Sequence, residues 1–334
     1  MSDLNQLFGP ANNLPSTAPR HLDEIIDDIA SLPDGERSPN IRIWGDPATN
    51  YVYIDSLQMR ELHWEGMPNV TSLDIYYTQL ERFPSILHMT GLTYLGLYGN
   101  QFRSVPDLSA LENLQNLYLS DGEIEDIQGL MGLLNLRYLN LGYNKLSALP
   151  ELGAMTELRG LYLSNNQLSE LPELSGLTNL DNLQVRGNQL AALPELSGLT
   201  LLRYLYCEQN QLSEIPSLTG LSALRYLYCY ENQLTSLPSF SGLSELYYLR
   251  CYDNQLTELP DMTGLTKLRY VHAQNNQMDA AAIDAALIQL AGSGMASNGQ
   301  FNYSGNPGAS NDQRSTAANT AKSTLTSRGW SITV

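Results

Sequence analysis

Residues 158–177 read LRGLYLSNNQLSELPELSGL, and the pattern of this stretch returns every 22 residues along most of the chain. Its fixed positions can be written LxxLxLxxNxLxxLPxLxxL. The asparagine recurs without exception at Asn144, Asn166, Asn188, Asn210, Asn232, Asn254 and Asn276. A period of this length predicts a solenoid in which each repeat forms one coil and stacking of the coils makes the core.

The alternation LxL near the start of each repeat predicts a short strand. Leu161 and Leu163 then point inward, while Tyr162 between them points outward. The asparagine ends the strand, where its amide can bond backbone groups that the turn leaves unpaired. Eight repeats carry a proline on the return side, which excludes a regular helix there. We therefore expect parallel strands on one side of each coil and 3₁₀ or extended segments on the other.

This pattern resembles the leucine-rich repeat in its short, 22-residue form, like that of internalins and related bacterial proteins. The resemblance covers roughly residues 50–280. It implies a curved solenoid of the α/β class, with the parallel sheet on the concave face. The ending AKSTLTSRGWSITV, residues 321–334, resembles the caps of leucine-rich repeat proteins found in bacteriophage particles and on bacterial surfaces.

The ends of the chain depart from the repeat, which predicts three parts. Residues 1–40 form an arm with one short amphipathic helix at His21–Leu32. Residues 41–278 form the solenoid, and residues 279–334 form a C-terminal cap in the order helix, strand, helix, strand. A cap is needed because an open solenoid end exposes core and strand edge. An irregular first coil is expected to use Val52, Ile54, Met59 and Leu62, with Leu57 in the asparagine position.

Composition excludes several classes of partner. Lysine and arginine number 18 against 35 aspartate and glutamate, which gives a net charge of −17. Binding to nucleic acid or to anionic lipid needs a basic surface, so we expect neither. The chain has no run of 18 apolar residues that could span a bilayer. Its first residues, Met-Ser-Asp-Leu-Asn, lack the basic and apolar regions of a secretory signal, so we expect none.

The sequence contains no recognisable catalytic motif. Its four histidines are scattered, with none in a metal-ligand spacing such as HExxH, and no phosphate-binding or nucleophile motif lies between a strand and a helix. We expect a non-enzymatic protein without cofactor or metal. Two alternatives stay open, because Glu231 and Asp253 take the same outward position in adjacent coils, near Glu208. Such a group could act as paired catalytic acids or hold a cation.

Three cysteines, Cys207, Cys229 and Cys251, are spaced by 22 residues and take the inward position that Leu163 holds in its repeat. Neighbouring coils would bring their α-carbons about 4.8 Å apart, within reach of a disulfide. Inward thiols in an apolar core are typical of small buried hydrophobic residues. We expect all three to be buried and reduced.

Tyrosine marks the outward face of the strands. Seventeen of the 20 tyrosines fall in outward positions of the repeats, and arginine accompanies them. Cross-strand aromatic pairs stabilise a sheet, but tyrosine and arginine are also enriched at binding hot spots. We expect a contact surface, called here the Tyr–Arg surface, formed by Arg203, Tyr204, Tyr206, Arg225, Tyr226, Tyr228, Tyr230, Tyr248, Arg250, Tyr252, Arg269 and Tyr270.

These features favour a non-enzymatic adhesin or structural component of a phage particle. The concave face would contact a partner protein or a cell-surface glycan, and residues 1–40 would contact another subunit of the assembly. Localisation in the virion, after synthesis in the cytoplasm, follows from that hypothesis. The alternative is a bacterial effector or intracellular interaction module that is cytoplasmic or leaves the cell without a signal peptide.

Overall fold

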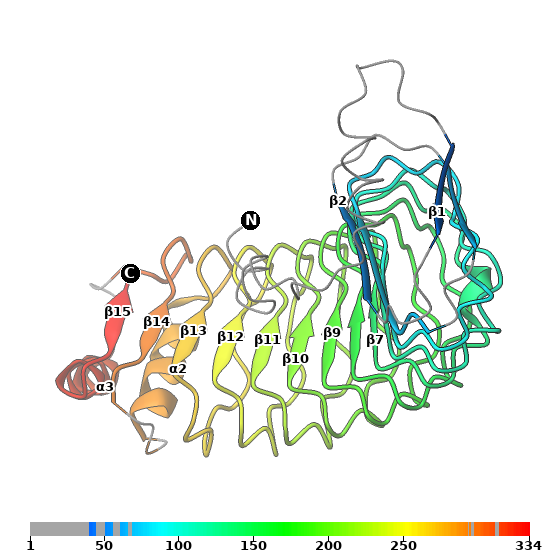
Figure 1. Ribbon diagram of the computed structural model, residues 1–334. Coiled ribbons are helices and arrows are strands. Elements are labelled where there is room, and N and C mark those ends of the chain that lie inside the picture. The colour runs from blue at the N-terminus through cyan, green and yellow to red at the C-terminus, as the bar shows by residue number, and fades with distance from the viewer. Residues whose placement is uncertain are drawn as a thin grey trace.

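The computed structural model describes residues 40–44, 51–55, 61–65, 69–292, 294, 297–310 and 314–334. The expected arm, residues 1–40, lies outside these ranges except for Asn40. Figure 1 shows a row of stacked coils that bends along its length, with the strands side by side on the inner side of the bend. The predicted curved solenoid with a parallel sheet is confirmed.

Within the described ranges, 13 strands form one sheet in which every neighbouring pair is parallel. Except for β3, consecutive strands are neighbours, as a solenoid requires. The strands are β2 (Tyr51–Asp55), β4 (Ser72–Tyr76), β5 (Tyr94–Gly96), β6 (Asn116–Tyr118), β7 (Tyr138–Asn140), β8 (Gly160–Tyr162), β9 (Asn182–Gln184), β10 (Tyr204–Tyr206), β11 (Tyr226–Tyr228), β12 (Tyr248–Arg250), β13 (Tyr270–His272), β14 (Gln300–Asn302) and β15 (Ser331–Thr333).

The first coil differs from the one expected. Val52 and Ile54 are buried on β2, as the pattern predicts. Leu62, however, lies in β3 (Glu61–Glu65), which pairs in parallel with β1 (Asn40–Trp44) in a separate two-stranded sheet. Figure 1 shows β1 across the coil from β2. The backbone of β3 is satisfied by β1 and not by the main sheet, while Leu57 and Met59 lie outside the described residues.

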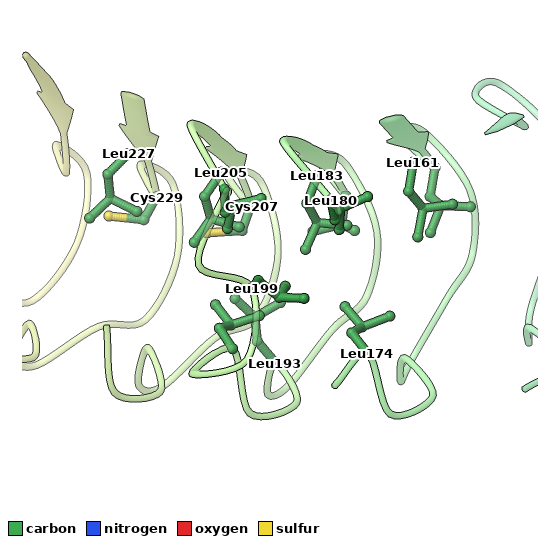
Figure 2. Close-up of a cluster of buried hydrophobic side chains, with 14 of the residues drawn as sticks. Leu161, Leu174, Leu180, Leu183, Leu193, Leu199, Leu205, Cys207, Leu227 and Cys229 are labelled. Carbon is green, nitrogen blue, oxygen red and sulfur yellow. The ribbon is translucent and has the colours of Figure 1, made fainter. Parts of the chain in front are cut away.

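The core is a continuous column of leucine side chains inside the coils. Leu161, Leu183, Leu205 and Leu227 are fully buried, one in each successive strand. Figure 2 shows the sulfurs of Cys207 and Cys229 among these leucines. All three cysteines are buried and free, as expected, and burial raises the pKa of the Cys251 thiol to about 12. A thiol held neutral in this way packs as a small apolar group.

Each repeat asparagine joins its own coil to the preceding one. The Oδ1 of Asn210 accepts from the backbone N–H of Leu190 at 3.1 Å. Its Nδ2 donates to the carbonyl of Val185 at 3.0 Å and to that of Cys207 at 3.1 Å. The neighbouring repeats use the same set of bonds, so Asn188 and Asn232 extend the ladder in both directions. These bonds satisfy backbone groups at the strand ends that would otherwise be buried without partners.

The return side contains short turns. In the described part of the chain, η2 (Gln128–Leu130) is the one 3₁₀ helix. Elsewhere tight turns take its place, as where the N–H of Leu177 donates to the carbonyl of Leu174 at 2.9 Å. A chain that returns in turns is shorter than one that returns in a helix, which suits a repeat of only 22 residues.

The C-terminal end is closed by α2 (Ala280–Gly292), β14, α3 (Thr316–Ser327) and β15. An ion pair ties the two helical segments together, because Arg314 lies 2.7 Å from the Asp284 carboxylate and its guanidinium packs over the Tyr303 ring. The cap thus covers the last coil and its strand edge. Neither described helix has the length and apolar character needed to cross a membrane.

We expect Asn210→Ala to lower the free energy of unfolding by about 2 kcal/mol, because it leaves the buried N–H of Leu190 without a partner, whereas the carbonyl of Val185 keeps the bond that Asn188 donates. Urea unfolding followed by circular dichroism measures the loss. Asn179→Ala is the matched control, since the Asn179 amide makes one exposed bond to the Thr156 carbonyl. Equal losses in the two variants would contradict a structural role for the ladder.

Candidate binding site

The structure brings the residues of the Tyr–Arg surface together on strands β10–β13 and the residues that flank them. Register pairing aligns Tyr204, Tyr226, Tyr248 and Tyr270 across four neighbouring strands. A second row aligns Tyr206 with Tyr228 and Arg250. Arg203 and Arg225 precede their strands and are exposed, whereas Arg269 is half-buried. Tyr230 and Tyr252 follow their strands, the first buried and the second half-buried.

The aligned rings stack on one another. Ring centroids are 5.0 Å apart for Tyr204 and Tyr226 and 4.3 Å apart for Tyr248 and Tyr270, with nearly parallel planes. Tyr230 and Tyr252 form a third stack at 4.3 Å. Stacking fixes the rings before any partner arrives, so little side-chain entropy is left to lose on binding.

Arg250 ends the second row. Tyr206 and Tyr228 stack at 4.7 Å, and the guanidinium of Arg250 lies over the other side of this stack, 4.6 Å from the Tyr228 centroid and 4.9 Å from that of Tyr248. A guanidinium over an aromatic face is attracted by the ring quadrupole. The arginine is therefore held against the rings of Tyr228 and Tyr248.

A pocket of about 330 Å³ opens beside this row. Tyr206, Glu208 and Tyr230 line one part of it, and Ser164, Gln184 and Arg186 line another. Tyr206 and Tyr230 belong to the predicted Tyr–Arg surface, whereas Glu208, Gln184 and Arg186 do not. The available signal was the change of side-chain size in one outward position, from Gly142 and Ser164 to Arg186 in successive coils.

Glu208 is the unusual group in this pocket. Its side chain is only 4% exposed, and within the described residues its Oε2 atom has no hydrogen-bond partner. The nearest cation is Arg186, whose Nε lies 3.9 Å from Oε1. Burial raises the pKa of Glu208 to about 7, although Arg186 and Arg250 oppose the rise. A buried carboxylate with a free oxygen is costly in the folded state and available to a ligand.

The other two carboxylates considered from the sequence are occupied by amides. Gln209 donates to Glu231 at 2.9 Å, and Asn275 donates to Asp253 at 2.7 Å. The described ranges contain no group of three or more histidine, cysteine or acidic residues placed to hold a metal ion. Glu231 and Asp253 therefore contribute charge to one edge of the face.

A second aromatic cluster lies near the N-terminal end of the sheet. Tyr76 packs on Tyr98 at 4.9 Å, and Tyr94 packs on Tyr118 at 5.5 Å, around the buried carboxylate of Asp74. Burial raises the pKa of the Tyr94 hydroxyl far above its ordinary value. The tyrosines of this cluster are partly exposed, as those at β10–β12 are, but the pocket described above is lined by the tyrosines at β10–β12.

A larger hollow of about 710 Å³ lies beside Glu81, Arg103 and Glu123. It differs from the pocket at Glu208 because its lining is solvated: Glu81 and Arg103 are exposed and Glu123 is half-buried. Lys145 pairs with Glu123 there. Solvated charges of this kind contribute little to recognition.

Family models match the central coils of the chain. Residues 156–198 and 200–245 match a model described as Leucine Rich repeats (2 copies), and residues 112–168 match one described as Leucine rich repeat. This protein is a leucine-rich repeat protein. No curated protein matches the chain. Among solved structures, similar chains include the bacterial proteins InlJ and YopM and the leucine-rich repeats of FLRT2.

The functional domain of InlJ from Listeria monocytogenes, described as including a cysteine ladder, is 24% identical with a TM-score of 0.60. The match covers 70% of this chain and 51% of that one. YopM from Yersinia enterocolitica is 26% identical with a TM-score of 0.52, over 74% of this chain and 56% of YopM. This leucine-rich repeat protein thus spans about half the length of either relative.

A third match lies in an octameric complex of Latrophilin 3, Unc5D and FLRT2, in which FLRT2 supplies the leucine-rich repeats. It is 22% identical with a TM-score of 0.66, covering 85% of this chain and 93% of that one. The fold of this leucine-rich repeat protein is therefore shared with solenoids of different origin, and its function has to be argued from its own surface.

We expect the charge on Glu208 to lower stability in a pH-dependent way. Its pKa is about 7 when folded, above the ordinary 4.5. Between these values the folded state keeps a proton that the unfolded state releases, so stability falls as the pH rises through this window and stays low above it. Glu208→Gln should therefore exceed the wild type in free energy of unfolding at about pH 8, by on the order of 2 kcal/mol. The advantage should disappear at about pH 4.

Urea unfolding at both pH values measures this difference. Glu231→Gln is the control, because Glu231 is exposed and water solvates its charge. A Glu208→Gln variant whose advantage stays constant with pH, or is absent at about pH 8, would contradict the burial of an ionised carboxylate.

Proposed function

We propose that this leucine-rich repeat protein is a non-enzymatic binding module whose Tyr–Arg surface contacts a partner protein. The observation that carries the proposal is the stacked, aligned tyrosines with Arg250 packed over Tyr228 at 4.6 Å. Tyrosine supplies a large contact area at low entropic cost, and a held guanidinium supplies directional donors. Such residues typically form the energetic centre of a protein interface.

One similar structure supports a protein as the partner class. FLRT2 lies in a complex with Latrophilin 3 and Unc5D. Leucine-rich repeat solenoids are protein interaction modules, with extended concave surfaces suited to that role. The partner itself is not named by this comparison.

A purely structural role for the tyrosine rows is the competing explanation. Cross-strand aromatic pairs contribute roughly 0.2–1 kcal/mol each to a sheet. Tyr206, Tyr226, Tyr228 and Tyr248 nevertheless remain partly exposed, so a part of each ring faces water. A contiguous aromatic surface in contact with water is typical of an interaction site.

We expect Tyr228→Ala to weaken partner binding roughly 30-fold, because truncating a central aromatic anchor typically costs about 2 kcal/mol. Tyr228 is central: it stacks on Tyr206, meets Tyr248 edge-on at 5.8 Å and carries Arg250 over its face. The experiment uses the full chain as bait for host-envelope proteins, followed by calorimetric titration of each captured protein against wild type and variant.

Tyr118→Ala is the matched control. Tyr118 takes the same outward position in an earlier coil and also packs on two tyrosines, Tyr94 and Tyr98. Its removal should change the melting temperature as much as that of Tyr228 but leave affinity unaltered. If Tyr228→Ala lowers the melting temperature and keeps full affinity, the rows reinforce the sheet and the proposal fails.

We also propose that the protein is a component of a phage particle and that residues 1–40 attach it to another subunit. The support is the resemblance of residues 321–334 to caps of phage-particle and bacterial-surface leucine-rich repeat proteins. A bacterial effector, cytoplasmic or released without a signal peptide, is the alternative. Apart from Asn40, residues 1–40 lie outside the described residues.

Mass spectrometry of purified particles tests this placement, and absence of the chain from them would end it. Deletion of residues 1–19 should abolish incorporation while leaving the melting temperature of the isolated protein unchanged, because in this proposal the arm contacts another subunit and not its own solenoid. A sharp drop in melting temperature would instead make the arm a cap of the solenoid.

A further inference from the structure

The pocket beside Tyr206 is built by a change of side-chain size along one outward position. In four successive coils this position holds Ser164, Arg186, Glu208 and Tyr230. The small side chain of Ser164 leaves space on one side, and the tyrosines wall the other. The resulting volume of about 330 Å³ is at the lower end of the range for small-molecule sites.

Two buried polar atoms in this lining lack partners within the described residues. They are Oε2 of Glu208, an acceptor, and Nε of Arg250, a donor. Both residues line the pocket. Native proteins rarely leave such atoms unsatisfied, and each one costs free energy until a ligand bonds it. Because both atoms are out of solvent contact, the two side chains must turn toward a ligand, which would donate to the carboxylate and accept from the guanidinium.

Tyr206 offers an apolar platform next to these atoms. One face of its ring is covered by Tyr228 at 4.7 Å. On the other side its strand partner is Gln184, whose amide donates along its own strand to Asn182 at 3.2 Å. The second face of Tyr206 therefore adjoins the pocket. The C–H groups on one side of a sugar ring carry partial positive charge and pack on such a face.

The pocket lining carries charges of both signs. Arg186 and Arg250 face Glu208 in the lining, and Arg186 also donates to Gln209 at 2.8 Å. Glu231, which accepts from Gln209, is exposed and lies outside the lining. A ligand with a single charge would meet a side chain of the same charge in the lining, which would repel it. Hydroxyl groups, in contrast, both donate and accept hydrogen bonds.

We propose that this pocket binds one neutral sugar ring, which stacks on Tyr206 and places its hydroxyls between Glu208 and the two arginines. The pocket shares Tyr206 and Tyr228 with the proposed protein contact surface, but sugar binding is a separate proposal. Sugar binding can be disproved while the protein contact is retained. The ligand class is an uncharged glycan residue.

The test uses saturation-transfer NMR at about pH 8 with the full chain and four neutral probes: the methyl glycosides of glucose, galactose, mannose and N-acetylglucosamine. At least one should bind. Tyr206→Ala should abolish the transfer, Tyr206→Phe should keep it, and Glu208→Gln should weaken binding about tenfold, as expected for loss of one charge-assisted bond. Tyr118→Ala, outside the pocket, should bind as the wild type does.

A charge series on one ring tests whether charges of both signs in the lining disfavour an ionic ligand. Methyl glucuronide and methyl glucosaminide, which add a negative and a positive charge, should each bind at least about tenfold more weakly than the best neutral glycoside. No transfer from any neutral probe, equal binding by Tyr206→Ala and wild type, or tighter binding of either charged ring would overturn the proposal. Loss of protein-partner binding in Tyr228→Ala together with no sugar binding would assign the pocket to the protein contact.

Discussion

The buried asparagine at the end of each strand is the contact on which the rest of the structure depends. Asn254 shows why: its Oδ1 accepts from Leu234 and its Nδ2 donates to Cys229, both in the preceding coil, as well as to Cys251 in its own. One amide can satisfy these groups in a single alignment of the two coils. A slip of one residue would break the bonds and turn the inward leucines to solvent.

Fixed alignment converts positions in the repeat into columns on the surface. Every residue two positions before the repeat asparagine lies beside its counterparts in the coils on either side, which is how Arg186, Glu208 and Tyr230 come to adjoin. Small changes between repeats therefore acquire a geometric meaning. The small side chain of Ser164 leaves space for the pocket. Arg250, which follows two tyrosines in its row, places its guanidinium over the Tyr228 ring.

The 22-residue period of the sequence explains which features of the fold and of the binding surface could be predicted. It predicted the sheet, the inward cysteines and the alignment of Tyr204 with Tyr226, because each follows from spacing alone. The pairing of β1 with β3 could not be predicted, since those segments carry no repeat. The pocket could not be predicted for another reason. The burial of Glu208 depends on the size and direction of side chains from neighbouring coils, which no single repeat specifies.

The buried carboxylate of Glu208 lowers the stability of the fold and is not needed to form it. The exposed pair of Lys145 with Glu123 keeps its charges in water, where they cost little. Glu208 instead keeps a carboxylate out of water, with Arg186 at 3.9 Å too distant for a hydrogen bond. A glutamine would fill the same volume without that cost. Groups that lower stability in this way and face a pocket are concentrated at functional sites, because only a bound ligand recovers the interaction that the fold leaves unmade.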